Sequence, residues 1–421
     1  MYLATTGRRT DAPSRPAGTG RRVPGTVVAL GAVSLVTDVS SEMVTAVLPL
    51  YLVLGLGLSP LQFGFLDGLF NGATALVRLL GGRLADRGGG RHRTVAGAGY
   101  LLSALSRLGL LLAGGAAGGI AAALAADRLG KGVRTAPRDA LITLSAPPDA
   151  LGRAFGVHRA MDTTGALLGP LVAFAVLWAT ADAYDAVFVV SFATGLFGVL
   201  VLVLYVPAGP APAARAEPTA GPVPAPRAAG RPRNRALADP VFRRVVTAAA
   251  LLGAATIGDS FLYLLLQRGL DLPALLFPLL PLGAAAGYLL LAVPAGRLAD
   301  RTGRRVPFLC GHGALLAAYL TLLAPPGWPV AVLVLLLLGV FYAATDGVLM
   351  ALAGPVLPLA GRASGLAVLQ TGQALARLAG AAGFGAAWTW WGPRPALAVA
   401  ALALGAALVA AWRILPGREV S

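Results

Sequence analysis

Long apolar runs separated by short polar segments dominate the pattern of residues along the chain. A helix that spans a bilayer needs about 20 mostly apolar residues, and lengths of about 17–25 are usual. Twelve runs reach this length, so the pattern predicts an all-α membrane protein with six spans in each half. In the first half the runs lie near Val27–Val53, Leu61–Leu84, Thr94–Ala113, Gly118–Leu141, Phe155–Trp178 and Ala186–Tyr205. In the second half they lie near Val245–Gln267, Pro273–Leu298, Val306–Ala324, Val330–Leu352, Ser364–Trp388 and Pro395–Trp412.

The segment between the two sets of runs is rich in Pro, Ala and Arg. It contains too little apolar material to fold by itself, which predicts a flexible, disordered cytoplasmic tether. The expected domain organisation is a cytoplasmic tail at 1–26, a six-helix bundle at 27–206, the tether at 207–240, a second six-helix bundle at 241–413 and a cytoplasmic tail at 414–421.

A short sequence repeat relates the two halves. The hexapeptide Gly-Arg-Leu-Ala-Asp-Arg occurs at Gly82–Arg87 and at Gly296–Arg301, about half of the 421-residue chain apart. Gly361-Arg362-Ala-Ser-Gly365 similarly resembles Gly152-Arg153-Ala-Phe-Gly156. Two like halves built from membrane spans indicate a secondary transporter that arose by duplication.

Composition agrees with a membrane location. The chain has 57% hydrophobic and only 12% charged residues, whereas a soluble domain carries about 25% charged residues. A single cysteine, Cys310, excludes an intramolecular disulfide and a thiolate metal cluster. Lipid is therefore an expected partner, and the expected state is a monomer with no cofactor and no bound metal.

The net charge of +16 raises the question of nucleic-acid binding. Such a surface needs a continuous basic patch, and the arginines here lie in short loops between apolar runs, so we expect no nucleic acid. If both termini are cytoplasmic, only Arg268 and Arg394 fall in loops on the opposite side. This bias predicts a multi-pass protein of the inner or plasma membrane with both termini in the cytoplasm.

The loops that contain the repeated hexapeptide resemble a known signature. The first loop is Gly82-Arg-Leu-Ala-Asp86-Arg87-Gly-Gly89-Gly-Arg91, and the second is Gly296-Arg-Leu-Ala-Asp300-Arg301-Thr-Gly303-Arg304-Arg305. Both resemble the G-x-L-a-D-r-x-G-r-[KR] motif of the major facilitator superfamily. The second copy matches at every position, and the first departs at Gly90, where a basic residue is usual.

This resemblance implies twelve helices in two pseudo-symmetric six-helix bundles that work by alternating access. In the family, the motif forms a latch on the cytoplasmic side that breaks as the halves move. Glycines permit tight turns, the aspartate can face helix N-termini and the arginines can form pairs across the bundle. The alternative is that these charges only set the topology. The expected gate residues are Gly82, Asp86, Arg87, Gly89, Arg91, Gly296, Asp300, Arg301, Gly303 and Arg304.

Three further stretches narrow the resemblance. They are Thr37–Met43 in the first span, Asp127–Asp139 in the fourth and Gly152–Gly165 in the fifth. Together they look like a poorly characterised prokaryotic branch of facilitator permeases, usually labelled efflux or multidrug proteins. Gly165-Ala-Leu-Leu-Gly169-Pro170 resembles the G-x-x-x-G-P motif of proton-linked antiporters, although this glycine spacing also serves plain helix packing.

Charged residues inside the predicted spans are the candidate functional groups, because a charge at bilayer depth needs a partner or water. Asp38 and Glu42 are four residues apart and share a helical face near the middle of the first span. Asp127, Lys131, Arg134 and Arg138 form a stripe along the fourth span, and Lys131 is the only lysine in the chain. The family fold implies that the first, fourth, seventh and tenth spans line a central cavity. The expected cavity and proton-coupling residues are Asp38, Glu42, Arg128, Lys131, Asp162, Asp259 and Asp346.

Two interpretations of the acids in the first span remain open. Asp38 and Glu42 could exchange a proton or contact a cation, with Arg128 and Lys131 adjusting their proton affinity or binding an anionic group of the cargo. Alternatively, each acid could form a permanent salt bridge to Arg128 or Lys131.

The preferred functional hypothesis is a proton-coupled exporter of small organic solutes. The alternatives are a proton symporter or uniporter that imports a sugar, metabolite or siderophore-like compound, and a receptor or scaffold without transport. An enzyme is not expected, because the sequence contains no nucleotide-binding loop, serine–histidine–acid set or metal-ligand spacing.

Overall fold

A computed structural model of the chain describes residues 23–69, 92–147, 151–207, 239–345, 348–353, 356–357 and 362–415. These ranges are almost entirely helical and contain no strand, which confirms the predicted all-α class. Nine helical segments within them are long and apolar enough to cross a membrane.

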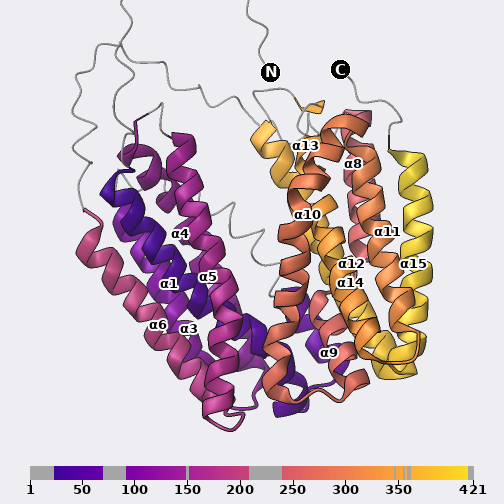
Figure 1. Ribbon diagram of the computed structural model, residues 1–421, viewed down its shortest axis with the longest axis horizontal. Coiled ribbons are helices and arrows are strands. Elements are labelled where there is room, and N and C mark those ends of the chain that lie inside the picture. Colours follow the sequence, from indigo (N-terminus) through magenta and orange to yellow (C-terminus); the bar gives the residue numbers. More distant parts are fainter. Residues whose placement is uncertain are drawn as a thin grey trace, which may run out of the picture.

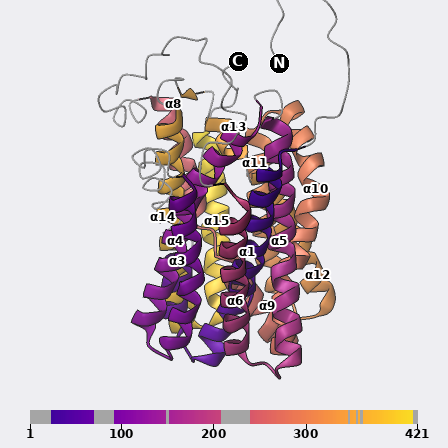
Figure 2. The same cartoon turned by 90° about the vertical axis from the view of Figure 1, so that its left-hand side faces the viewer.

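The described helices of the first half follow the predicted runs closely, and the part of the second run, Leu61–Leu84, after residue 69 lies outside the described residues. They are α1 (Gly25–Leu50), continued by the π-turn η1 (Tyr51–Gly55), a helical segment at 60–69, α3 (His92–Leu112), α4 (Ala117–Ser145), α5 (Leu151–Ala179) and α6 (Tyr184–Tyr205). Helix α4 is as long as α5 and longer than α3, and it carries more charged residues than either of them. Helix α1 packs against α5 and α6, and α3 packs against α4 (Figure 2).

The helices of the second half also follow the predicted runs. They are α8 (Pro240–Ala254), α9 (Asp259–Leu270), η4 (Ala274–Leu279), α10 (Leu280–Thr302), α11 (Arg305–Leu322), α12 (Trp328–Thr345), α13 (Val348–Ala353), α14 (Arg362–Trp391) and α15 (Pro393–Ile414). Asp239 caps the start of α8 by accepting hydrogen bonds from the amides of Val241 and Phe242.

The seventh predicted span is divided into two helices. Helix α8 ends at Ala254, and α9 begins at Asp259 after a short non-helical stretch. Gly258 has an extended backbone and immediately precedes α9. Non-helical backbone at membrane depth is stable only where protein or a water-filled cavity surrounds it. The break therefore predicts that protein or a cavity surrounds this stretch.

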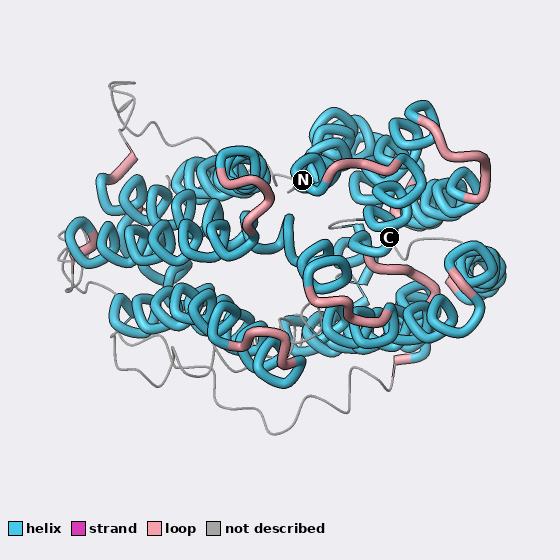
Figure 3. Tube along the Cα trace, turned by 90° about the horizontal axis from the view of Figure 1, so that it is seen from below, coloured by secondary structure: helices cyan, strands magenta, loops and turns pink. Residues whose placement is uncertain are grey.

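The two halves lie side by side (Figures 1 and 3) and come together at one end (Figure 1). Helix α1 begins and α15 ends at the other end, where the halves diverge (Figure 1). At the joined end, the amide of Leu61 donates a hydrogen bond of 3.1 Å to the hydroxyl of Thr389. The rings of Phe63 and Phe261 meet edge to face, 4.8 Å apart.

Glycines allow this close approach of the halves. A Cβ atom at Gly64 would collide with the carbonyl oxygen of Ala381, and one at Gly385 would collide with the carbonyl oxygen of Pro60. The contact between the segment at 60–69 and α14 therefore depends on the absence of side chains at these positions.

Four exposed tryptophans lie at the joined end of the molecule. Trp178, Trp328, Trp390 and Trp391 lie at the ends of α5, α12 and α14, and each is 58–73% exposed. Tryptophan is enriched where a membrane meets water, because its ring is amphipathic. These residues therefore mark one boundary of the bilayer.

Replacing Gly385 by valine should separate the halves at the joined end. In a Cys310→Ser background, we expect Gly385→Val to raise the alkylation rate of a cysteine at position 381 at least tenfold, because the alanine there is only 3% exposed. Gly383→Val is the matched control on the same helix, since a Cβ atom at Gly383 meets nothing within 4 Å. Equal rates in the two variants would contradict the packing role of Gly385.

Candidate functional site

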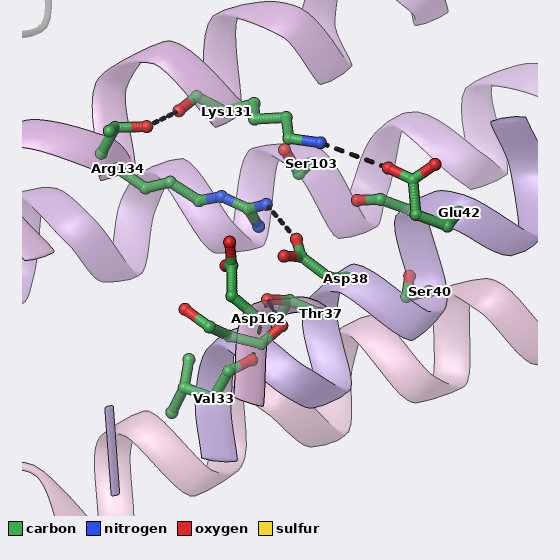
Figure 4. A network of polar contacts seen from close by, with 12 residues as sticks. Val33, Thr37, Asp38, Ser40, Glu42, Ser103, Lys131, Arg134 and Asp162 are labelled. Carbon is green, nitrogen blue, oxygen red and sulfur yellow. Dashed lines mark hydrogen bonds and ion pairs between the residues drawn. The ribbon is translucent and has the colours of Figure 1, made fainter. Parts of the chain in front are cut away.

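A cluster of ion pairs lies inside the first half, between α1 and α4 (Figure 4). Arg134 of α4 lies 3.2 Å from the carboxylate of Asp38, and its guanidinium stacks over the ring of Tyr100 at 4.5 Å. The Nζ of Lys131 lies 3.6 Å from Oε1 of Glu42. The two pairs differ in burial: the side chains of Asp38 and Arg134 are 12% and 4% exposed, whereas those of Glu42 and Lys131 are 28% and 27% exposed.

A second set of pairs connects α4 to α3. Asp127 binds Arg107 of α3 at 2.8 Å and its own neighbour Arg128 at 2.8 Å, and all three side chains are buried. Arg107 also donates a hydrogen bond of 3.0 Å to the hydroxyl of Ser41 on α1. Asp127 therefore holds α3 and α4 together, and Arg107 extends the contact to α1.

The stripe continues toward the end of α4 through Arg138. Its guanidinium lies 3.7 Å from Asp162 of α5, which also pairs with Arg159 at 3.4 Å. The buried ring of His158 shares a hydrogen bond of 2.9 Å with the hydroxyl of Ser34 on α1. The predicted stripe of α4 thus directs its charges toward α1, α3 and α5.

The glycines of the predicted antiporter-like motif pack α5 against α1. A Cβ atom at Gly165 would collide with the backbone carbonyl of Leu35, and one at Gly169 would collide with Glu42. Pro170 lies within α5 directly after Gly169. These positions allow α5 to approach α1 beside the carboxylates that pair with α4.

A cavity of about 400 Å³ lies between the two halves. It reaches from α1 and the segment at 60–69 to the break before α9, and on to α12 and α14. Thr45 and Leu124 line this cavity and also a small pocket beside Arg107 and Asp127. The ion-pair cluster and the cavity are therefore neighbours.

The cavity contains two carboxylates at the break between α8 and α9. Asp259, the first residue of α9, accepts a hydrogen bond from the hydroxyl of Tyr342 on α12. Asp67 of the first half accepts a hydrogen bond of 2.9 Å from the hydroxyl of Ser260. The latter bond joins the two halves at the start of α9, where unpaired helix amides favour negative charge.

Several predicted site residues have defined positions. Asp259 lines the cavity. Asp38, Glu42 and Lys131 lie in the ion pairs between α1 and α4, and Arg128 pairs with its neighbour Asp127. Gly303 follows α10 with φ of +81°, a conformation that favours glycine, and Arg304 precedes α11. Gly296, Asp300 and Arg301 lie on α10, and the side chains of Asp300 and Arg301 are not described. Asp346, Gly82, Asp86, Arg87, Gly89 and Arg91 lie outside the described residues.

Some important residues were not among the predicted site residues. The partner of Asp38 is Arg134, although Arg128 and Lys131 were the expected candidates. The seven-residue spacing from Asp127 already placed Arg134 on the correct face of α4. Arg377, Tyr342 and Asp67 line the cavity, and the charge of Arg377 within an apolar run was the signal that could have identified it. Within the described ranges, no group of three acidic, His or Cys side chains could hold a metal ion.

Comparison with known sequences places the chain among transporters. The model of the Major Facilitator Superfamily matches residues 30–288 and 279–421. An uncharacterized MFS-type transporter of Methanocaldococcus jannaschii is 38% identical over 149 residues, which cover 35% of this chain and 36% of that protein. An uncharacterized protein of Mycobacterium tuberculosis is 35% identical over 158 residues, which cover 38% of each chain. The chain thus matches little more than a third of the length of these curated relatives.

Solved transporter structures share the fold. The nucleoside transporter NupG superposes with a TM-score of 0.75 at 15% identity, over 93% of this chain and 98% of that chain. A bacterial homolog of the human lysosomal transporter Spinster superposes with a TM-score of 0.66 at 19% identity, over 94% and 95% of the two chains. At this level of identity the likeness concerns the fold alone.

The burial of the two pairs between α1 and α4 predicts different contributions to stability. Arg134→Leu leaves the Asp38 carboxylate buried without its ion-pair partner, which should cost about 3–5 kcal/mol of unfolding free energy. Lys131→Gln breaks the more exposed pair and should cost at most about 1 kcal/mol. Equilibrium unfolding in mixed detergent micelles measures both.

The double variant Asp38→Leu/Arg134→Leu removes both charges and should recover most of the stability lost in Arg134→Leu. Equal losses for the Arg134 and Lys131 variants, or no recovery in the double variant, would show that burial of the Asp38–Arg134 pair does not determine its contribution to stability.

Proposed function

We propose that this chain, which belongs to the Major Facilitator Superfamily, exports small organic solutes in exchange for protons. As a member of this family it is a multi-pass membrane protein and a secondary transporter. The observation that carries the proposal is a cavity with both polar and apolar side chains between two bundles that join at one end and diverge at the other. This arrangement supports alternating access, in which a central site between two bundles opens to one side of the membrane at a time.

The predicted topology relates this state to the direction of transport. With both termini in the cytoplasm, the bundles diverge toward the cytoplasm, and an exporter loads its cargo from that side. The proposal assigns control of a latch on the cytoplasmic side to Asp86 and Asp300.

The ion pairs of α1 give a physical route for proton coupling. Protonation of Glu42 or Asp38 removes the negative charge that binds Lys131 or Arg134, so proton binding changes how α1 is held against α4. The Glu42 pair is the more exposed of the two and is the place where a proton would enter. The released positive charge then favours an anionic group nearby.

A test of coupling needs a transported compound, which a thermal-shift screen of the purified protein against metabolites and antibiotics supplies. In proteoliposomes, we expect Asp38→Asn to abolish flux of that compound driven by a pH gradient, while the variant still inserts. The amide cannot exchange the proton, although it keeps the size of the carboxylate.

Asp185→Asn is the matched control, because Asp185 is exposed in the first turn of α6, away from the cluster. It should leave the flux unchanged. Full pH-driven flux in Asp38→Asn would remove Asp38 from the coupling mechanism.

Direction is tested with membrane vesicles of opposite orientation. An exporter that exchanges cargo for protons should accumulate the compound in inverted vesicles whose interior is more acidic than the medium. The interior of these vesicles corresponds to the outside of the cell. Accumulation in right-side-out vesicles with an inwardly directed proton gradient would instead establish a symporter.

A further inference from the structure

The walls of the cavity between the halves differ in chemistry. The first half supplies mainly apolar side chains, among them Leu48, Leu52, Phe63 and Leu66. The second half supplies most of the polar side chains, among them Asp259, Tyr263, Tyr342, Gln370, Gln373 and Arg377, and the first half adds Thr45 and Asp67. A solute that fits both walls has an apolar body and a polar end, and the polar end faces the second half.

Arg377 is a positive group of this polar wall that lacks an ion-pair partner among the described residues. Its Nε atom is buried and has no hydrogen-bonding partner there. Buried polar groups in folded proteins are ordinarily hydrogen-bonded, so this donor beside the cavity is available to a molecule that enters it. A guanidinium presents parallel donors that match a carboxylate, which makes an organic acid the natural partner.

Asp259 is a negative group of the same wall. The hydroxyl of Tyr342 donates to its Oδ2 atom, and no basic side chain of the described part forms an ion pair with it. Its carboxylate can therefore accept further hydrogen bonds from a ligand. The other cavity carboxylate, Asp67, is already bound to Ser260 across the interface of the halves.

The fold brings Arg377 and Asp259 to the same break in the seventh span. A Cβ atom at Gly380 would collide with the carbonyl of Ala254 and lie 3.2 Å from that of Thr256. Arg377 is one helical turn before Gly380 and thus lies beside the break, and Asp259 begins the helix that follows it. The two side chains form no ion pair with each other, and both line the cavity.

A ligand with a single charge would satisfy only one of these groups. A cation would leave Arg377 unpaired, and an anion would leave Asp259 without a cationic partner. A zwitterion satisfies both. The cavity volume of about 400 Å³ falls in the range of about 300–1,000 Å³ that is usual for small-molecule sites.

We propose that the cavity binds amino-acid-like zwitterions with an apolar body, the carboxylate at Arg377 and the ammonium group at Asp259. The apolar body lies against α1 and the segment at 60–69. This assignment rests on the proposed transport function, since it names the class of cargo that the central cavity selects.

The test is equilibrium binding to the purified full-length protein in detergent, without a membrane or a pH gradient. The probes are leucine, methionine and phenylalanine, each with its amide, which is only cationic, and its N-acetyl derivative, which is only anionic. At least one zwitterion should bind, and its amide and N-acetyl forms should bind at least tenfold more weakly.

Two variants should change selectivity in opposite directions. Arg377→Gln should weaken the zwitterion at least tenfold and leave the affinity for the amide unchanged. Asp259→Asn should weaken the zwitterion similarly and leave the affinity for the N-acetyl acid unchanged. A purely structural role for either residue would weaken all three compounds together.

Arg268→Gln serves as the control arginine variant, because Arg268 stacks on Trp388 at 5.2 Å and does not line the cavity. It should leave all affinities unchanged. Arg377→Lys keeps the charge without the paired donors and should retain the preference for the zwitterion at reduced affinity.

The assignment is overturned if none of the three zwitterions binds, if an amide binds as tightly as its parent, or if Arg377→Gln leaves affinity unchanged. Flux in proteoliposomes distinguishes this failure from failure of the transport proposal. Intact pH-driven flux of an uncharged compound would refute the cargo class alone, and binding of a zwitterion without any flux would refute the transport proposal alone.

Discussion

Pairing of buried charge is the constraint on which the rest of this structure depends. A charged side chain at membrane depth costs several kcal/mol unless a partner compensates it. Helix α4 carries its charges on one face, and Asp127, Lys131 and Arg134 pair with α3 and α1. The order of packing in the first half follows from this need. Helices that supply complementary charges lie next to α4, and apolar faces are left to the lipid.

The two halves, although similar in sequence motif and helix order, use polarity differently. In the described part of the first half, the charges between α1, α3, α4 and α5 pair with one another, as Asp38 does with Arg134. The second half directs Asp259 and Arg377 into the cavity without joining them in an ion pair. Under the proposed function, the internal pairs respond to protons and the groups of the second half that form no ion pair bind the cargo.

Small residues set how closely these polar regions approach. Gly165 and Gly169 bring α5 against α1 beside Glu42. Gly64 and Gly385 bring the halves together at the joined end. Without a hydrophobic force between helices in lipid, close packing of this kind holds the bundles together.

The sequence alone determined the helices and the duplication, because a membrane span satisfies its backbone hydrogen bonds locally and its length follows from the apolar run. It also determined the charged face of α4, since a helical repeat fixes which side chains align. Partner choice was decided only by tertiary packing: whether Asp38 meets Arg128, Lys131 or Arg134 depends on the rotation and offset of α1 against α4. The break before Asp259 and the approach of Arg377 to it likewise arise between helices far apart in the chain. No local pattern encodes such distances, because they are set by how whole helices fit against one another.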